Sequence, residues 1–286
     1  MSSPARRLAA ALLVASPAVL SVAPALAQSP ALAAPTSPTY ADLVDLADSA
    51  PLVVHAQVRK FARVGEDRAR GLRPGLGRFY VEAQTQALIT GRSPLGQSFA
   101  YLVDLPLDAK GKPSLRKKDE VIIFARPVAG RPAELQLIQP GAQLAWSAPL
   151  EARLRTIITA LLSPDAPAMV TGVREYIFVP GTLAGEGETQ IFLNTADASA
   201  ASITVRHRPN QPPQWGVSFS ELVAAVDRPP ERDTLEWYRL ACFLRRDAPP
   251  SANLSEGYEA QRTADADYRM VMESLGPCRR TMQATA

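Results

Sequence analysis

The chain has 286 residues, of which 47% are hydrophobic and 21% are charged, and its formal net charge is +3. This is the composition of an ordinary globular protein, long enough to bury two modest cores. Arg6 and Arg7 lie in an N-terminal segment that we expect to be removed, which lowers the charge from +3 to +1. So small a charge excludes a strongly basic protein and gives no support to nucleic-acid binding.

Residues 1–27 have the pattern of a secretory signal peptide. The two arginines form a positive start, residues 8–26 are apolar, and Ala25-Leu26-Ala27 matches a cleavage site. The apolar run is short and broken by prolines, which favours cleavage over a membrane span. No cysteine follows it, which argues against a lipoprotein anchor. The sequence therefore predicts a periplasmic or secreted protein, cleaved after Ala27, with no transmembrane segment in the mature chain.

The next part of the chain predicts a linker, a helix and a barrel. Residues 28–39 are rich in proline, alanine and serine, which is typical of an extended linker, and Thr39 can cap a helix over residues 40–49. Apolar and polar residues alternate from Leu52, which predicts a half-buried, edge-like strand with His55 facing outward. Further strands are expected at residues 79–90, 99–105, 120–126, 135–139 and 142–146. They predict a small antiparallel β-barrel domain over residues 40–148.

The strand pattern of residues 50–147 resembles that of OB-like barrels in some exported bacterial proteins. A long first strand precedes a wide loop over residues 65–77, two strands follow, and "LRKKDEVIIFA" runs from a charged turn into an apolar strand. The resemblance implies that the loops beside the first strands flank a ligand-binding face.

Residues 149–286 predict an α+β domain. An amphipathic helix is expected at residues 150–162, and two more at 233–244 and 258–275, the last one ending at Gly276-Pro277. Strands are expected at residues 170–179, 189–194, 202–206 and 215–219. The fold class is therefore α+β, with an OB-like barrel followed by a second, mixed domain.

The two cysteines predict a disulfide between the last two helices. Export makes a disulfide the default state of Cys242 and Cys278. The 36-residue separation corresponds to about 3–4 kcal/mol in the chain-entropy model. The two cysteines and two histidines lack the short spacings of metal sites, so no metal or other cofactor is assigned.

The glycine-rich stretch "PGTLAGEGETQIFLNT", residues 180–195, raises the question of a phosphate-binding loop. Such a loop needs Lys and Ser/Thr after its last glycine and a helix beyond, whereas Glu188 and a β-branched, aromatic run follow here. The sequence instead predicts a hairpin turn, with Glu186 and Glu188 facing solvent.

The sequence assigns no catalytic residue, and it favours a non-enzymatic function over an enzymatic one. The chain has no G-x-S-x-G motif. His207 lies between Arg206 and Arg208, whose charges oppose the imidazolium of a catalytic triad, so we expect a surface histidine. A hydrolase that uses Glu186, Glu188 or His207 in a cleft between the domains stays open as an alternative.

A cluster of cations near the first strands is the strongest candidate site. The loop after the first strand is rich in arginine, and three cations precede the later apolar strand. The candidate ligand-binding residues are Arg68, Arg70, Arg73, Arg78 and Lys117. They predict an anionic ligand such as a polysaccharide, a phospholipid headgroup or an acidic protein surface. The competing interpretation is a solvated loop, partly neutralised by Glu66 and Asp67.

The whole chain resembles uncharacterised secreted proteins of alphaproteobacteria. The signal peptide carries this resemblance together with "VVHAQVRKFARV", "GRFYVEAQTQALITG", "GETQIFLNT" and "WYRLACFL…GPC". The resemblance implies location and no mechanism. We therefore expect a non-catalytic periplasmic binding or interaction protein, whose partner is an anionic envelope component or another envelope protein. The alternatives are the hydrolase above and a structural envelope protein.

Export can be tested at the predicted cleavage site. The protein recovered from the periplasm or medium of a bacterial host is expected to begin at Gln28, which N-terminal sequencing and intact mass will show. Ala27→Arg should leave the precursor uncleaved because the site needs a small residue, and Ala34→Arg is the matched control. An exported chain that keeps Met1 would contradict the prediction.

Overall fold

The structure is a computed structural model that describes residues 37–92, 94–220 and 228–282. The predicted signal peptide and all but the last three residues of the predicted linker lie outside the described residues, so both stay predictions. No helix in the described part of the chain is long and apolar enough to cross a membrane.

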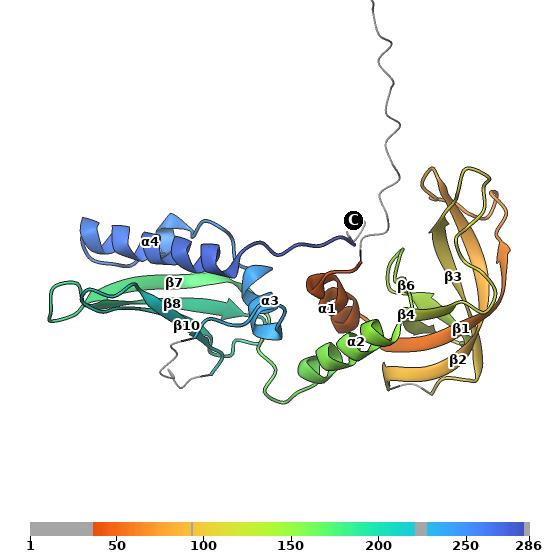
Figure 1. The fold of residues 1–286 in the computed structure, drawn as a ribbon, viewed down its shortest axis with the longest axis horizontal. Helices are drawn as coiled ribbons and strands as arrows, with labels where there is room; N and C mark the ends of the chain where they lie inside the picture. The colour runs from red at the N-terminus through yellow and green to blue at the C-terminus, as the bar shows by residue number, and fades with distance from the viewer. Residues whose placement is uncertain (1–36, 93, 221–227, 283–286) are drawn as a thin grey trace, which may run out of the picture. The chain divides into compact units, whose positions relative to one another are not determined.

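The N-terminal half contains a closed five-stranded barrel (Figure 1), which confirms the predicted small barrel, although one of its strand pairs is parallel and the prediction was antiparallel throughout. Its strands are β1 (Leu52–Arg63), β2 (Leu76–Gly91), β3 (Ser98–Pro106), β4 (Glu120–Val128) and β5 (Arg131–Leu137). They follow the order β1-β2-β3-β5-β4, and pairing of β4 with β1 closes the barrel. All pairs are antiparallel except β3 with β5. The short strand β6 (Gln143–Ala145) pairs with β4.

Inward and outward positions alternate along β2, as a two-residue period requires. Phe79, Val81 and Ala83 are buried in the core, whereas Tyr80 and Glu82 are exposed. The central strand β1 differs, because Leu52 to Ala56 are all buried. The strand pairs with both β2 and β4, so it is not an edge strand.

The prediction that His55 is a surface histidine is therefore wrong, because it is only 9% exposed. Its ring stacks on Trp146 with 4.7 Å between ring centroids. One ring nitrogen lies 3.2 Å from Glu120 and the other 3.3 Å from Glu151 of helix α2 (Ala148–Leu161). His55 is thus covered by Glu120 of β4, Glu151 of α2 and Trp146 of the segment between β6 and α2, which the alternation pattern alone could not reveal.

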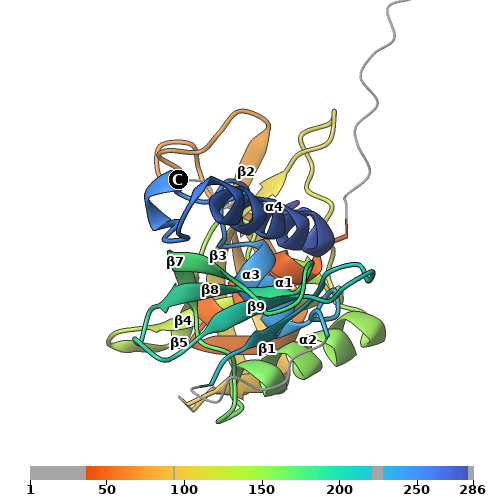
Figure 2. The ribbon, with the colours of Figure 1, turned by 90° about the vertical axis from the view of Figure 1, so that its left-hand side faces the viewer.

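The C-terminal half contains a second sheet with a helix along it. Strands β7 (Val170–Pro180), β8 (Gly187–Thr195), β9 (Ser202–His207) and β10 (Gln214–Ser218) pair antiparallel in the order β10-β9-β8-β7. Helix α4 (Tyr258–Leu275) lies along one face of this sheet (Figures 1 and 2). The remaining elements are α3 (Leu235–Ala241) and the 3₁₀ turn η1 (Pro250–Ala252). The α+β class is confirmed, whereas the division into two domains at residue 148 stays a prediction.

The predicted disulfide is present between Cys242 at the end of α3 and Cys278 beyond α4. Their Cα atoms are 5.0 Å apart, inside the normal range for a disulfide. The disulfide holds the start of the C-terminal tail, residues 276–282, beside α3.

Helix α1 (Tyr40–Ser49) begins at Thr39, which forms the predicted cap with Asp42. Its aspartates Asp42, Asp45 and Asp48 recur every three residues and so lie along one side, which we call the acidic face. Asp45 accepts hydrogen bonds from Arg280 of the tail and from the Tyr238 hydroxyl of α3. Asp48 accepts a 3.4 Å hydrogen bond from the buried Arg239.

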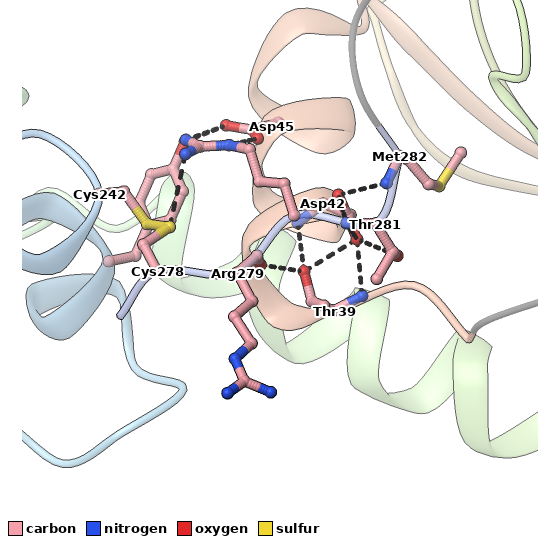
Figure 3. Close-up of polar contacts among 10 residues, drawn as sticks. Thr39, Asp42, Asp45, Cys242, Cys278, Arg279, Thr281 and Met282 are labelled. Atoms are coloured by element: carbon pink, nitrogen blue, oxygen red, sulfur yellow. Dashed lines mark hydrogen bonds and ion pairs between the residues drawn. A yellow bond between two sulfur atoms is a disulfide. The ribbon is translucent and has the colours of Figure 1, made fainter. Parts of the chain in front are cut away.

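Asp42 binds the end of the described tail (Figure 3). Its carboxylate accepts hydrogen bonds from the backbone and hydroxyl of Thr281 and from the backbone of Met282, at 2.7–3.1 Å. Burial alone would raise the pKa of Asp42, but these bonds and those from Thr39 bring it below its usual value. The acidic face therefore ties α1 to residues more than 190 positions away.

Asp42→Asn is expected to lower the free energy of unfolding at pH 7 by about 1–3 kcal/mol, because an amide cannot accept all of these hydrogen bonds. The folded pKa lies below the unfolded value, so the contribution is present above about pH 4 and is lost as pH falls through the folded pKa. Urea unfolding at pH 7 and pH 3 should show a smaller difference at pH 3. Asp165→Asn, at an exposed site, is the control; an equal difference at both pH values would contradict the prediction.

Candidate functional site

A groove of about 650 Å³ opens on the barrel between β3 and β5. These two strands pair only at Ala100–Glu134 and Tyr101–Leu135. Beyond that short ladder the strands separate, and residues of β2, β3 and β5 line the space between them. The volume lies within the usual range of ligand-binding sites.

An exposed apolar pair forms part of the groove wall. Tyr80 of β2 lies directly opposite Leu102 of β3, and their exposed fractions are 40% and 50%. Both occupy outward positions of their strands, next to the inward Phe79 and Val103. Cross-strand partners on one face lie close together, so they present a continuous apolar surface with a ring at one side.

The next pair along the same wall is ionic. Arg78 donates two hydrogen bonds to Asp104, at 2.7 and 2.8 Å, and the pKa of Arg78 is raised, mainly by this hydrogen bonding. Across the groove Arg131 donates to Glu134 at 2.9 Å. Each arginine therefore has its charge matched by a carboxylate, and the groove itself carries no large excess of positive charge.

The predicted arginines of the loop do not line the groove, although the loop contacts Arg78, which does. Arg68, Arg70 and Arg73 are exposed in the loop over residues 64–75, which Ala69 anchors by being buried. The carbonyl of Arg70 accepts a 3.4 Å hydrogen bond from the Arg78 side chain. Arg78 is therefore the predicted ligand-binding residue that lines the groove, and the loop adjoins it at Arg70.

Lys117 lies elsewhere. It belongs to the exposed turn before β4, where the neighbouring Lys118 donates its backbone N–H to Val58 of β1 at 2.8 Å. Lys117 is not among the residues that line the groove. Its grouping with the arginines rested on charge alone, because the relative position of two loops cannot be read from the sequence.

Sequence reasoning missed Tyr80, Leu102 and Asp104. A signal was present, since Tyr80 alternates with the apolar Phe79 and Val81 and so had to face outward from the barrel. Leu102 and Asp104 could be paired with Tyr80 and Arg78 only once the register of β2 and β3 was known.

A second polar cluster joins α4 to the second sheet. Asp267 of α4 accepts a 2.5 Å hydrogen bond from Thr189 of β8 and lies 2.9 Å from His207 of β9. Burial raises the pKa of Asp267, although both hydrogen bonds act in the opposite direction. His207 is 22% exposed and lines two neighbouring cavities, of about 600 and 470 Å³. The sequence placed His207 between the cations Arg206 and Arg208; in the structure a carboxylate far along the chain, that of Asp267, also lies beside it.

The glycine-rich stretch is a hairpin turn, as predicted. Val179 pairs with Glu188 and Pro180 with Gly187. Glu186 accepts a hydrogen bond from the backbone of Leu183, and Glu188 lies 3.3 Å from Arg206. Both glutamates are half-buried, so the prediction that they face solvent holds only in part. Within the described ranges no group of three or more histidines, cysteines or acids could hold a metal ion.

No protein-family model matches the chain, and no curated protein matches it significantly. The function is therefore inferred from the geometry of the groove and of the His207 cluster.

Asp267→Asn is expected to remove a pH-dependent loss of stability. The folded pKa of Asp267 is raised, so its carboxyl favours folding most when protonated, and this contribution is lost as pH rises from about 4 through the folded pKa. Asparagine cannot ionise, so the free energy of unfolding of the variant should improve relative to wild type over that rise. Chemical denaturation from pH 3.5 to 7 measures it. Glu273→Gln on the exposed side of α4 is the control, and parallel pH profiles would disprove the assignment.

Proposed function

We propose that this protein is a non-catalytic periplasmic binding protein whose ligand is an acidic envelope polysaccharide lying in the barrel groove. The observation that carries the proposal is the exposed Tyr80–Leu102 pair on the groove wall. The barrel has five strands, and in OB-like barrels, which the sequence resembles, the β2–β3 face and its flanking loops bind extended ligands. Export is supported by the disulfide, which is typical of oxidising compartments.

The chemistry of the groove favours a ring-containing ligand. An aromatic side chain held at a fixed position on a sheet offers a flat apolar face for a sugar ring. Leu102 extends that face, and the Arg78–Asp104 pair beside it offers both hydrogen-bond donors and acceptors. Even a polymer of neutral sugar rings could contact the apolar face and hydrogen-bond to the Arg78–Asp104 pair.

The loop explains why the ligand should be acidic. Five arginines lie between residues 63 and 78, against Glu66 and Asp67. Arg78 is neutralised by Asp104, so the remaining excess lies in the loop that adjoins Arg78. A chain whose rings fill the groove and whose carboxylates reach this loop would satisfy both surfaces. An acidic protein segment would gain the charge contacts without a ring for Tyr80.

The hydrolase alternative rests on His207 and Asp267, which have the pairing of a general base with its orienting carboxylate. In the described part of the chain no serine, threonine or cysteine hydrogen-bonds to His207. Thr189 instead donates to Asp267, which suits a link between α4 and the sheet. The binding function therefore has the stronger support.

The proposal predicts binding of polyuronates. Isothermal titration of the mature protein with oligogalacturonate should give saturable binding that weakens as salt rises, and the methyl-esterified oligomer should bind more weakly because it keeps the rings and loses the charges. Tyr80→Ala should weaken binding about tenfold. Tyr258→Ala is the matched control, since Tyr258 is an exposed tyrosine away from the groove.

The loop and the groove can be tested separately. Replacing Arg68, Arg70 and Arg73 by Gln should reduce the salt dependence of binding. The control removes the same charge elsewhere, by changing Arg208, Arg245 and Arg246 to Gln. Equal affinity for oligogalacturonate and for its methyl ester would contradict the role of the loop. An unchanged affinity in Tyr80→Ala would contradict the role of the groove. Cleavage of the ester that depends on His207 would favour the hydrolase.

A further inference from the structure

Three arginines from separate parts of the chain line one small cavity beside α1. Arg153 comes from α2, Arg232 from the segment before α3, and Arg279 from the C-terminal tail. The rings of Tyr40 and Trp237 also line this cavity, whose volume is about 210 Å³. We call it the arginine cavity; it is separate from the barrel groove.

Neighbouring rings and acceptors position two of these guanidinium groups. Arg153 lies over the Tyr40 ring, 5.8 Å from its centroid, and donates to Asp233 at 3.1 Å. Arg232 lies 5.3 Å from the Trp237 ring centroid and donates to the carbonyl of Pro277 at 3.3 Å. Stacking on a ring leaves the edge of a guanidinium available for further hydrogen bonds.

Arg279 hydrogen-bonds to the start of α1 through its backbone and not through its side chain. Its backbone carbonyl accepts a 2.8 Å hydrogen bond from the Thr39 hydroxyl. Figure 3 shows its side chain extending away from the Asp42 carboxylate. The tail can therefore stay bound to α1 when only the Arg279 side chain is changed.

The charges around the cavity are unbalanced. The residues that line it include three arginines and a single acid, Asp233, which pairs with Arg153. The three arginines are solvent-exposed, and like charges brought this close together still repel one another. A bound dianion would balance the two excess charges.

The size and geometry of the cavity restrict which anion fits. Guanidinium groups match the oxygens of phosphate with paired hydrogen bonds. A volume of about 210 Å³ is below the usual range of ligand pockets, about 300–1,000 Å³, which suits a phosphate group with a small substituent and not a polymer. We propose that the arginine cavity binds a phosphate-class dianion, either a soluble phosphate or the phosphomonoester headgroup of a lipid.

Such a ligand would also strengthen the attachment of the tail. It would bridge Arg279 of the tail to Arg153 of α2 and to Arg232 before α3. A ligand that binds only the folded chain stabilises it by RT ln(1 + [L]/Kd), so the unfolding temperature rises with the ligand concentration.

The test is binding of inorganic phosphate to the mature protein. Isothermal titration at constant ionic strength, with chloride as the background anion, should show one saturable site, and phosphate should raise the unfolding temperature. Arg279→Gln should weaken phosphate binding about tenfold, and Arg232→Gln should do the same. Arg245→Gln, which removes an exposed charge elsewhere, should leave it unchanged.

Several outcomes would overturn the proposal. No saturable phosphate binding, or equal binding by wild type and Arg279→Gln, would do so. The unfolding temperature in chloride checks that each variant is folded; if Arg232→Gln fails to fold, Arg279→Gln decides alone.

Two further experiments identify whether the bound phosphate is a lipid headgroup or a soluble ligand. Co-sedimentation with vesicles that contain phosphatidic acid, and not with vesicles of phosphatidylcholine alone, would assign a lipid headgroup, provided that free phosphate competes. Binding of free phosphate without vesicle recruitment would assign a soluble ligand. Tyr80→Ala should leave phosphate binding and vesicle co-sedimentation unchanged. The proposals for the arginine cavity and for the barrel groove can therefore be tested independently.

Discussion

The acidic face of α1 is the contact on which the arrangement of the C-terminal elements depends. Asp42, Asp45 and Asp48 bind the tail and α3, whereas the opposite side of the helix is buried in the core. Only Ala50 and Pro51 separate α1 from β1. The helix therefore connects the first barrel strand with the last described residues of the chain. The disulfide between Cys242 and Cys278 acts on the same elements, because it holds the tail next to α3.

The proposed ligand site arises from an incomplete pairing. The parallel ladder of β3 and β5 is two residues long, so the barrel closes on one side and opens into a groove on the other. Charged residues inside the groove are paired with one another, which leaves the adjacent loop as the source of positive charge. Shape and charge are thus supplied by different segments. Such a division suits an extended ligand better than a compact one.

The sequence could predict the elements but few of their contacts. The cap at Thr39, the helix over residues 258–275 and the hairpin at residues 180–187 each depend on neighbouring residues, and each was predicted nearly to the residue. His55 and His207 were placed on the surface because their partners, Glu151 and Asp267, are far away in sequence. Among the candidate site residues, Arg78 could be placed near the groove from its strand, whereas Lys117 required the position of a second loop.

The sequence by itself determined the secondary structure, the α+β class, the alternation that turns Tyr80 outward and the pair of cysteines that forms the disulfide. Each of these follows from local periodicity, capping or composition. Only the tertiary structure decided what each polar group faces: the tail against Asp42, Asp104 against Arg78, and three arginines around one cavity. Hydrogen bonds and charges act over a few ångströms in space, and the residues they join here lie up to 240 positions apart in the chain.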